Sequence, residues 1–351
     1  MSHSHGQGPA TAAPPADAAA DSDAGRAVEA SVERQRALQQ AQDRRDAHGA
    51  HGGGAGEQSG QPVQTGPTEQ PTGLPPQHLE KSGRESELIP SPRFKAEHYR
   101  GSGKLQDQVA LITGGDSGIG RAVAVLFARE GADVCIVHLS SHDDARDTAA
   151  LVEAEGRRCL VVAGDVQDPD FCESAVHACV DELGRLDVLV NNAAYQQHAD
   201  SLLDIDQERL ERTFRTNVFG YLQMARAALP HLKRGACIIN TGSSTGLRGN
   251  PRLIDYSASK GAVHAFTKAL AQGLLPEGIR VNAVAPGPVW TPLNPADMPA
   301  QQVPEFGKKS DMKRPAQPEE LSPAYVFLAS PVCSSYITGV VLPVTGSVGA
   351  I

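Results

Sequence analysis

The stretch VALITGGDSGIGRAVAVLFAREG, from Val109 to Gly131, decides the fold of this chain. Its first five residues are an apolar, β-branched run bounded by glycine, which predicts a buried strand. A segment with helical periodicity follows from Gly118. The glycines between them have the spacing G-x-x-x-G-x-G, where a strand turns tightly into a helix whose start offers free N–H groups. An ordinary glycine-rich turn is the alternative, but the position between strand and helix favours dinucleotide binding.

The alternation of strand and helix patterns continues to the end of the chain. Helical patterns begin near residues 143 and 170, extend over 206–231, surround Tyr256 and begin again near 318. Further strands are predicted at 133–139, 159–165, 187–193, 236–242, 280–287 and 338–344. This order predicts an α/β fold: a single doubly wound, parallel-sheet domain of the Rossmann type, with ligands beyond the carboxyl ends of the strands.

Composition divides the chain near residue 100. Residues 1–85 are rich in Ala, Gly, Gln, Pro and His and have hardly any large apolar side chains. Such a segment cannot bury enough apolar surface to offset the entropy of ordering, so we expect a disordered N-terminal tail. Residues 86–103 are predicted to be an N-terminal arm, and residues 104–351 are long enough to form one α/β domain with a substantial core.

Charge and composition exclude several classes of function. The net charge is −9, and acids and bases are interspersed without a basic stripe, so we expect no nucleic-acid partner. No apolar run approaches the ~20 residues of a membrane span, and the N-terminus lacks the apolar core of a secretory signal. The six cysteines show no C-x-x-C spacing. We therefore predict no metal site and a cytoplasmic location.

One phenol and one ammonium stand four positions apart in DYSASKGAVHAF, from Asp255 to Phe266. On a helix, Tyr256 and Lys260 would share a face, and a cation beside a phenol lowers the phenol's pKa from its usual value of about 10. Such a pair can work as an acid/base. The alternative is an exposed tyrosine beside a solvated lysine, and this motif alone does not decide between them.

Together, the motifs resemble the short-chain dehydrogenase/reductase family. The elements T-G-x-x-x-G-x-G, N-N-A, a helical Asn, a Ser, Y-x-x-x-K and P-G occur in the family's order and spacing. Within the family, the arm ESELIPSPRFKAEHYRGSGKL and the segment VPEFGKKSDMKRPAQPEELSPAYVFLAS are similar to those of aldehyde reductases and glucose/ribitol dehydrogenases of bacteria and plants. Ala194 stands where the family usually has glycine, and we expect this small side chain to be tolerated.

The resemblance implies four catalytic residues: Asn217, Ser243, Tyr256 and Lys260. Tyr256 would give the proton, Ser243 would orient the substrate oxygen, and Lys260 would lower the phenol's pKa and hold the nicotinamide ribose. Asn217 would fix a water that relays protons. A turn role for Ser243 and a local helix bond for Asn217 are the simpler alternatives. The expected cofactor-binding residues are Gly114, Ser117, Gly118, Ile119, Gly120, His138, Asp165, Val166, Asn192, Ala193, Tyr256, Lys260, Pro286, Gly287, Val289 and Thr291.

The end of the second predicted strand bears on the choice between NAD and NADP. A carboxylate there bonds the ribose 2′-OH, whereas a basic residue receives a 2′-phosphate. This chain has the sequence HLSSH from His138 to His142. Hydroxyls and imidazoles suit a phosphate better than a bare ribose, and Arg121 is close in the sequence. We therefore predict NADP as the cofactor.

The predicted function is hydride transfer between NADP(H) and a small aldehyde, ketone or alcohol. One alternative is an NAD-dependent sugar or polyol dehydrogenase, and another is a non-catalytic dinucleotide-binding sensor or scaffold. The loop after Thr291, with Trp290, Met298 and Phe306 as its large apolar groups, is predicted to be a lid that excludes water. The family usually forms tetramers, so the resemblance implies a homo-tetramer.

Overall fold

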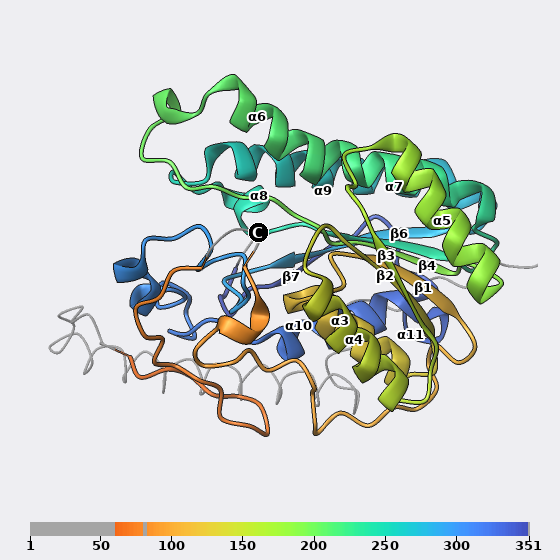
Figure 1. The fold of residues 1–351 in the computed structure, drawn as a ribbon, viewed down its shortest axis with the longest axis horizontal. Helices are drawn as coiled ribbons and strands as arrows, with labels where there is room; N and C mark the ends of the chain where they lie inside the picture. Colours follow the sequence, from red (N-terminus) through yellow and green to blue (C-terminus); the bar gives the residue numbers. More distant parts are fainter. Residues whose placement is uncertain (1–59, 80–82, 350–351) are drawn as a thin grey trace, which may run out of the picture. The chain divides into compact units, whose positions relative to one another are not determined.

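A computed structural model describes residues 60–79 and 83–349 of the chain. Seven parallel strands form one sheet in the order β3-β2-β1-β4-β5-β6-β7, so the strand order reverses between β1 and β4 (Figure 1). The single doubly wound sheet of the Rossmann type is thereby confirmed. The strands are β1 (Val109–Thr113), β2 (Asp133–His138), β3 (Cys159–Ala163), β4 (Val188–Asn191), β5 (Cys237–Thr241), β6 (Arg280–Pro286) and β7 (Val341–Val344).

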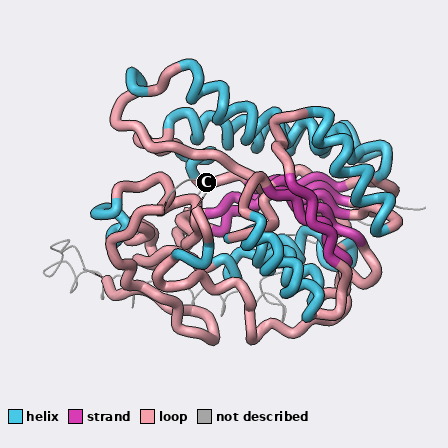
Figure 2. Tube along the Cα trace, viewed as in Figure 1, coloured by secondary structure: helices cyan, strands magenta, loops and turns pink. Residues whose placement is uncertain are grey.

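Helices cover both faces of this sheet (Figures 1 and 2). One face is covered by α3 (Gly118–Arg129), α4 (His142–Ala154), α10 (Pro318–Ala329) and α11 (Pro331–Ser334). The other face is covered by α5 (Pro169–Leu183), α6 (Gln207–Phe214), α7 (Gly220–Ala228) and α9 (Ile254–Leu274). The short α8 (Thr245–Arg248) follows β5. No helix within the described ranges is long and apolar enough to cross a membrane.

The sheet is buried on both sides, which explains the continuous apolar runs of its strands. All five residues of β1 are buried, as are all seven of β6. Alternate residues of each strand enter two separate cores, because successive side chains of a strand point to opposite faces. Ile112 and Phe127 belong to the core under α3 and α10, whereas Leu111 and Met224 belong to the core under α5, α7 and α9.

The long helix predicted over 206–231 is broken into four consecutive pieces. Between α6 and α7 lies a π-helical turn, η3 (Arg215–Phe219), and the 3₁₀ turn η4 (Leu229–His231) ends the run. Single π-turns inside α-helices often occur at functional sites. Asn217 lies in this turn, and its side chain is fully buried.

Residues 61–79 fall within the segment expected to be a disordered tail, and the structure describes them in contact with the domain. The Val63 N–H donates to the Met312 carbonyl at 2.9 Å, and the Leu79 N–H donates to the Pro295 carbonyl at 3.1 Å. The Gln70 amide donates to Glu319 at 3.0 Å. Residues 1–59 and 80–82 lie outside the described residues.

Two leucines explain why this polar segment is held. Leu74 and Leu79 are 5% and 6% exposed, and they join Leu88 of the arm in a cluster around the fully buried Trp290. The indole N–H of Trp290 also donates to the Pro90 carbonyl at 2.8 Å. The composition of residues 1–85 could not predict this packing. The apolar side chain on which the two leucines pack, Trp290, lies outside that segment.

We predict that Leu79→Ala will detach this segment from the lid. Leucine-to-alanine changes in packed sites destabilise a protein by about 2 kcal/mol or more, so the free energy of unfolding should fall and the lid should be cut faster by proteases. Denaturant unfolding and limited proteolysis measure both effects. Val63→Ala is the matched control, because Val63 is 44% exposed; an equal loss of stability in both variants would contradict the role of Leu79.

Candidate functional site

A cavity of about 1260 Å³ lies beyond the carboxyl ends of the strands. Its volume exceeds the usual range of a drug-sized ligand site, so it can accept a large ligand together with a second, smaller one. All the residues predicted to bind a cofactor line it except Gly120. Of the four predicted catalytic residues, Ser243, Tyr256 and Lys260 line the cavity, whereas Asn217 is buried behind it.

The glycine-rich turn between β1 and α3 leaves no room for side chains. Gly118 has φ +53°, and a Cβ there would lie 2.9 Å from the Thr291 methyl group. A Cβ on Gly120 would lie 1.9 Å from the Gly114 carbonyl oxygen. Gly120 therefore lets the first turn of α3 pack against Gly114, while Gly114 and Gly118 line the cavity. The Gly118 N–H itself donates to the Glu85 carboxylate.

His138, at the end of β2, places a ring nitrogen in the cavity wall that a cofactor ribose could bond. His138 is 3% exposed, lines the cavity, and its Nδ1 has no hydrogen-bond partner among the residues that the structure describes. A buried polar atom without a partner is costly, so a ligand that bonds it would be favoured. Burial and the neighbouring His142 lower the pKa of His138, which keeps this ring neutral at physiological pH.

Arg121 does not lie free near this position, contrary to the sequence-based expectation. Its guanidinium is 2.8 Å from the Glu85 carboxylate and 3.3 Å from Asp144, and its Nε donates to the Asp116 carbonyl at 2.9 Å. Glu85 is the last residue of the segment predicted to be a disordered tail, and the motif analysis did not place it there. Burial raises the pKa of Glu85 to about 7, although Arg121 partly opposes this rise. The positive charge of Arg121 is therefore already neutralised inside the protein.

Asp165 and Asn192 line the cavity with their polar groups engaged by the protein. Asp165 accepts from the backbone N–H of Gln167 at 2.9 Å. The Asn192 amide donates to the carbonyls of Thr113 and Gly114, both at 3.1 Å. Asn192 thus ties the end of β4 to the glycine-rich turn, which fixes the backbone around the cavity.

Tyr256 and Ser243 meet at the cavity wall. Tyr256, on the first turn of α9, is 8% exposed and hydrogen-bonded to Ser243, which follows β5. One turn later, Lys260 is fully buried; its Nζ donates to the Thr241 carbonyl at 2.7 Å and to the Tyr221 hydroxyl at 3.2 Å. The ammonium lies 5.6 Å from the centre of the Tyr256 ring. The pair is therefore buried, which excludes the alternative of an exposed tyrosine beside a solvated lysine.

Burial dominates the proton affinities of this pair. It raises the pKa of Tyr256 to about 12, and the hydrogen bond with Ser243 lowers it only in part. It also lowers the pKa of Lys260 to about 7. Lys260 was expected to lower the phenol's pKa, but in this structure desolvation outweighs any such effect. Tyr256 is therefore protonated at neutral pH.

Asn217 makes long-range bonds and not local ones. Its Oδ1 accepts from the Tyr195 N–H at 2.8 Å, and its Nδ2 donates to the Tyr195 carbonyl at 2.8 Å and to the Ser259 hydroxyl at 3.0 Å. The side chain therefore joins the π-turn to the loop after β4 and to α9. This arrangement differs from the local helix bond considered as the alternative.

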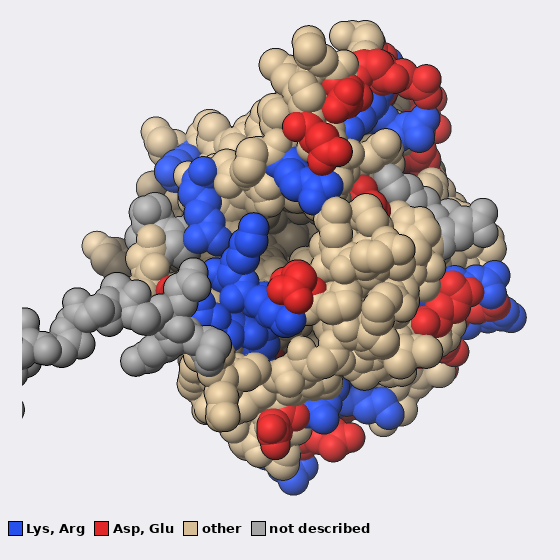
Figure 3. All heavy atoms as spheres, turned by 90° about the vertical axis from the view of Figure 1, so that its left-hand side faces the viewer, with Lys and Arg blue, Asp and Glu red and all other residues tan. Residues whose placement is uncertain are grey.

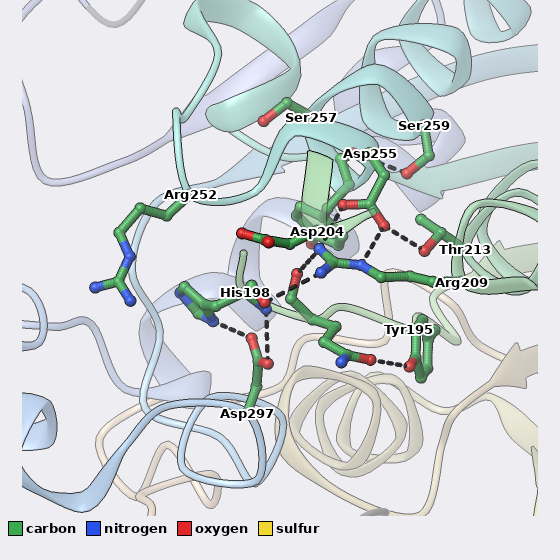
Figure 4. A network of polar contacts seen from close by, with 12 residues as sticks. Tyr195, His198, Asp204, Arg209, Thr213, Arg252, Asp255, Ser257, Ser259 and Asp297 are labelled. Carbon is green, nitrogen blue, oxygen red and sulfur yellow. Dashed lines mark hydrogen bonds and ion pairs between the residues drawn. The ribbon is translucent and has the colours of Figure 1, made fainter. Parts of the chain in front are cut away.

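A buried polar network that sequence motifs did not reveal holds the start of α9 (Figure 4). Asp255, next to Tyr256, pairs with Arg209 of α6 at 2.9 Å and accepts from the Thr213 hydroxyl at 2.7 Å. Arg209 also donates to the His198 carbonyl at 3.1 Å, and the His198 ring pairs with Asp297 of the lid. In the sequence, the available sign of this network was Asp255, a carboxylate directly before the predicted catalytic Tyr256.

The fold and the cavity define a dinucleotide-binding oxidoreductase, and comparison with known proteins gives the family. The family model described as enoyl-(acyl carrier protein) reductase matches residues 114–348. An uncharacterized oxidoreductase of Bacillus subtilis, YhdF, is 53% identical over 79% of this chain and 96% of its own length. The chain belongs to the short-chain dehydrogenase/reductase family and is an NAD(P)-dependent oxidoreductase acting on CH–OH groups.

Relatives with more specific names cover the same part of the chain. Glucose and ribitol dehydrogenase of Daucus carota is 48% identical over 78% of this chain and 96% of its own length. NADPH-dependent aldehyde reductase 1, chloroplastic, of Arabidopsis thaliana is 46% identical over 75% of this chain and 94% of its own length.

Solved structures show the same fold with either cofactor. A short-chain dehydrogenase from Burkholderia cenocepacia in complex with NADP has a TM-score of 0.66 and 34% identity, over 70% of this chain and 98% of that one. A 3-ketoacyl-(acyl-carrier-protein) reductase from Brucella melitensis complexed with NADH has a TM-score of 0.63 and 35% identity, over 69% and 98%.

We predict that Asp255→Ala will destabilise the protein and reduce its activity. The change leaves the buried Arg209 without its counter-ion, a loss that costs about 3–5 kcal/mol in comparable pairs, and it frees the helix turn that carries Tyr256. Urea unfolding measures the loss. The matched control is Glu208→Ala, which breaks an exposed pair with Arg212 and should change stability by less than about 1 kcal/mol. Equal losses in the two variants would contradict the argument.

Proposed function

We propose that this protein is an NADP(H)-dependent reductase of small aldehydes or ketones. The observation that carries the proposal is the protonated, cavity-facing Tyr256, hydrogen-bonded to Ser243 and placed one helical turn from the buried Lys260. A phenol that keeps its proton at neutral pH is suited to donate it to a carbonyl oxygen. Backbone of the glycine-rich turn, at Gly114 and Gly118, lines the same cavity and would lie beside the pyrophosphate of a bound dinucleotide.

The roles of the chain's own groups follow from their positions. A bound nicotinamide supplies the hydride. As negative charge develops on the substrate oxygen, the Tyr256 hydroxyl gives up its proton, and the Ser243 hydroxyl donates a second hydrogen bond that orients the oxygen. Lys260 holds its cation against the Thr241 carbonyl beneath the ring, where it stabilises the negative charge that builds up on the phenolate as the proton leaves. Asn217 acts as a positioning residue for the loop after β4.

The preference for NADP(H) rests on the turn between β2 and α4. His138, Ser140 and Ser141 line the cavity, and no carboxylate of this turn joins them among the described residues. The Arabidopsis relative is named an NADPH-dependent reductase, and the similar structure from Burkholderia cenocepacia is in complex with NADP. Arg121 contributes nothing to this preference, because its charge is neutralised by Glu85 and Asp144.

A second candidate is an NAD-dependent sugar or polyol dehydrogenase. Asp116 lines the cavity beside the glycine-rich turn, and a carboxylate there disfavours a 2′-phosphate. Burial raises the pKa of Asp116 to about 6, so most of its charge persists at neutral pH. The carrot relative is named a glucose and ribitol dehydrogenase, and a neighbouring structure is complexed with NADH.

The homo-tetramer and the cytoplasmic location also stand as proposals. Leu210, Phe219 and Leu222 on the run from α6 to α7 are 37%, 49% and 41% exposed. Large apolar side chains grouped on one helical run suit contact with a second copy of the chain.

The proposed function is tested by titrating the protein with NADPH and NADH in parallel and then adding a panel of aldehydes. We expect tighter binding of NADPH and aldehyde-dependent oxidation. In Tyr256→Phe, turnover should fall by at least about a hundredfold, because general acid catalysis by a positioned side chain contributes that much or more, whereas NADPH affinity should stay within about twofold.

The same experiment separates the competing functions. Tighter binding of NADH together with turnover of polyols would favour the NAD-dependent dehydrogenase over the proposed reductase. Binding without turnover of any aldehyde, ketone or polyol would favour the non-catalytic sensor. Tyr325→Phe is the matched control, because it removes another buried phenol, one that bonds Thr241 at 2.8 Å, without changing the Tyr256–Ser243 pair.

The high pKa of Tyr256 predicts a different pH dependence for the two directions. Reduction needs the protonated phenol, which is present well below pH 12, so titration of Tyr256 itself should leave kcat unchanged between pH 6 and 8. Any fall in kcat across this range should follow loss of the Lys260 proton, whose pKa is about 7. Oxidation of the alcohol needs the phenolate, whose fraction rises about tenfold per pH unit in this range. Rates in both directions across this range measure the effect. An oxidation rate that falls as the pH rises would contradict the assignment.

A further inference from the structure

The charged side chains that line the cavity differ between its two ends. We define the cofactor half as the part beyond β1, β2 and β3, and the substrate half as the part bounded by the loop after β4, the segment from α8 to the start of α9, and the lid. The cofactor half has two carboxylates, Asp116 and Asp165. The substrate half has four cations and one carboxylate: Arg212, Arg248, Arg252, Lys309 and Glu305.

The ion pairs of the substrate half do not balance this charge. Glu305 pairs with Lys308 at 2.7 Å, so it neutralises none of the four cations. Exposed carboxylates outside the cavity pair with two of them, Glu208 with Arg212 at 2.8 Å and Asp200 with Arg252 at 3.1 Å. Arg248 and Lys309 are exposed and pair with no residue that the structure describes. A chain of net charge −9 therefore keeps an excess of positive charge at the mouth of one half of its cavity.

Arg252 is the most firmly placed of these cations. One guanidinium nitrogen donates to Gln302 of the lid at 2.7 Å, and another lies 3.1 Å from the exposed Asp200. Its Nε is buried and has no hydrogen-bond partner among the described residues. A donor of this kind, in the cavity wall, can still receive an acceptor from a ligand.

The surface around the mouth of the cavity also shows more cationic than anionic side chains. Figure 3 shows a hollow with Lys and Arg side chains on several sides of it and few Asp and Glu side chains at its edge. Walls of low dielectric around a hollow concentrate the field of such charges and raise the local concentration of anions.

We infer that the physiological substrate is an anionic carbonyl compound, with a carboxylate or phosphate at the end away from the reacting carbon. This inference rests on the proposed reductase function and names its substrate class. Arg248 and Arg252 bind the anion, since guanidinium groups match the two oxygens of such groups, and Lys309 approaches from the lid. The carbonyl then lies at Tyr256, deeper in the cavity.

The test compares matched substrates that differ in charge. The pairs are butanal with succinic semialdehyde, and glyceraldehyde with glyceraldehyde 3-phosphate, so that the two pairs distinguish carboxylate from phosphate. We expect kcat/KM to favour the anionic member of at least one pair. Arg248→Gln and Arg252→Gln should each lower the ratio of anionic to neutral kcat/KM by about tenfold, the size of one charge-assisted bond. Salt should lower the wild-type ratio as well.

Two controls separate charge recognition from other effects. Arg226→Gln removes an exposed cation of α7 outside the cavity and should leave the ratio unchanged. Gln302→Ala breaks the link between Arg252 and the lid while keeping the charge, so it should lower the ratio by less than Arg252→Gln does.

Three results would overturn the inference. A ratio unaffected by Arg248→Gln and Arg252→Gln would remove the anion site and leave the reductase intact. Weaker NADPH binding in these variants, with an unchanged ratio, would assign the cations to the cofactor's phosphates. Absence of turnover with every aldehyde and alcohol would overturn the reductase itself, and the inference with it.

Discussion

The arrangement of the site depends on a fully buried ammonium group. Transfer of a charged amine out of water is costly unless polar partners surround it, and Lys260 has a carbonyl, a hydroxyl and two aromatic faces as partners. The carbonyl belongs to Thr241, the last residue of β5. The contact therefore fixes α9 against the end of the sheet, because any shift of the helix would leave the cation without compensation.

The second support of α9 acts one turn earlier. Asp255 precedes Tyr256 and is held by Arg209 and Thr213 from α6, so buried polar contacts fix the helix on both sides of the tyrosine. Side chains on rigid elements keep their geometry better than side chains on loops. The groups that meet the substrate's far end lie instead on α8, on the loop before α9 and on the lid. Chemistry is thus placed on the long helix α9 and the end of β5, and the proposed recognition of the substrate on a short helix and on loops.

Local patterns were sufficient to predict the sheet and the glycine-rich turn, whereas the predicted residues that line the cavity came from the resemblance to the family. A buried parallel strand is a continuous apolar run, and Tyr256 and Lys260 share a helix face by their spacing alone. The same patterns could not show that Asn217 lies in a π-turn and bonds a loop 22 residues away. Nor could they show the neutralisation of Arg121, because its partner Glu85 lies 36 residues earlier in the chain, at the end of the predicted tail.

The segment before the domain was the least predictable part, since its order depends on surfaces that it does not contain. Leu79 and Leu88 pack on Trp290 of the lid region, while Glu85, between them, bonds the Gly118 N–H at the start of α3 and pairs with Arg121. One short stretch therefore contacts both the wall of the cofactor half and the segment that covers the substrate half. The two leucines bury their apolar surface in the cluster around Trp290, so the order of the stretch depends on the contact with Trp290. Composition describes only the stretch, whereas its stability comes from this contact.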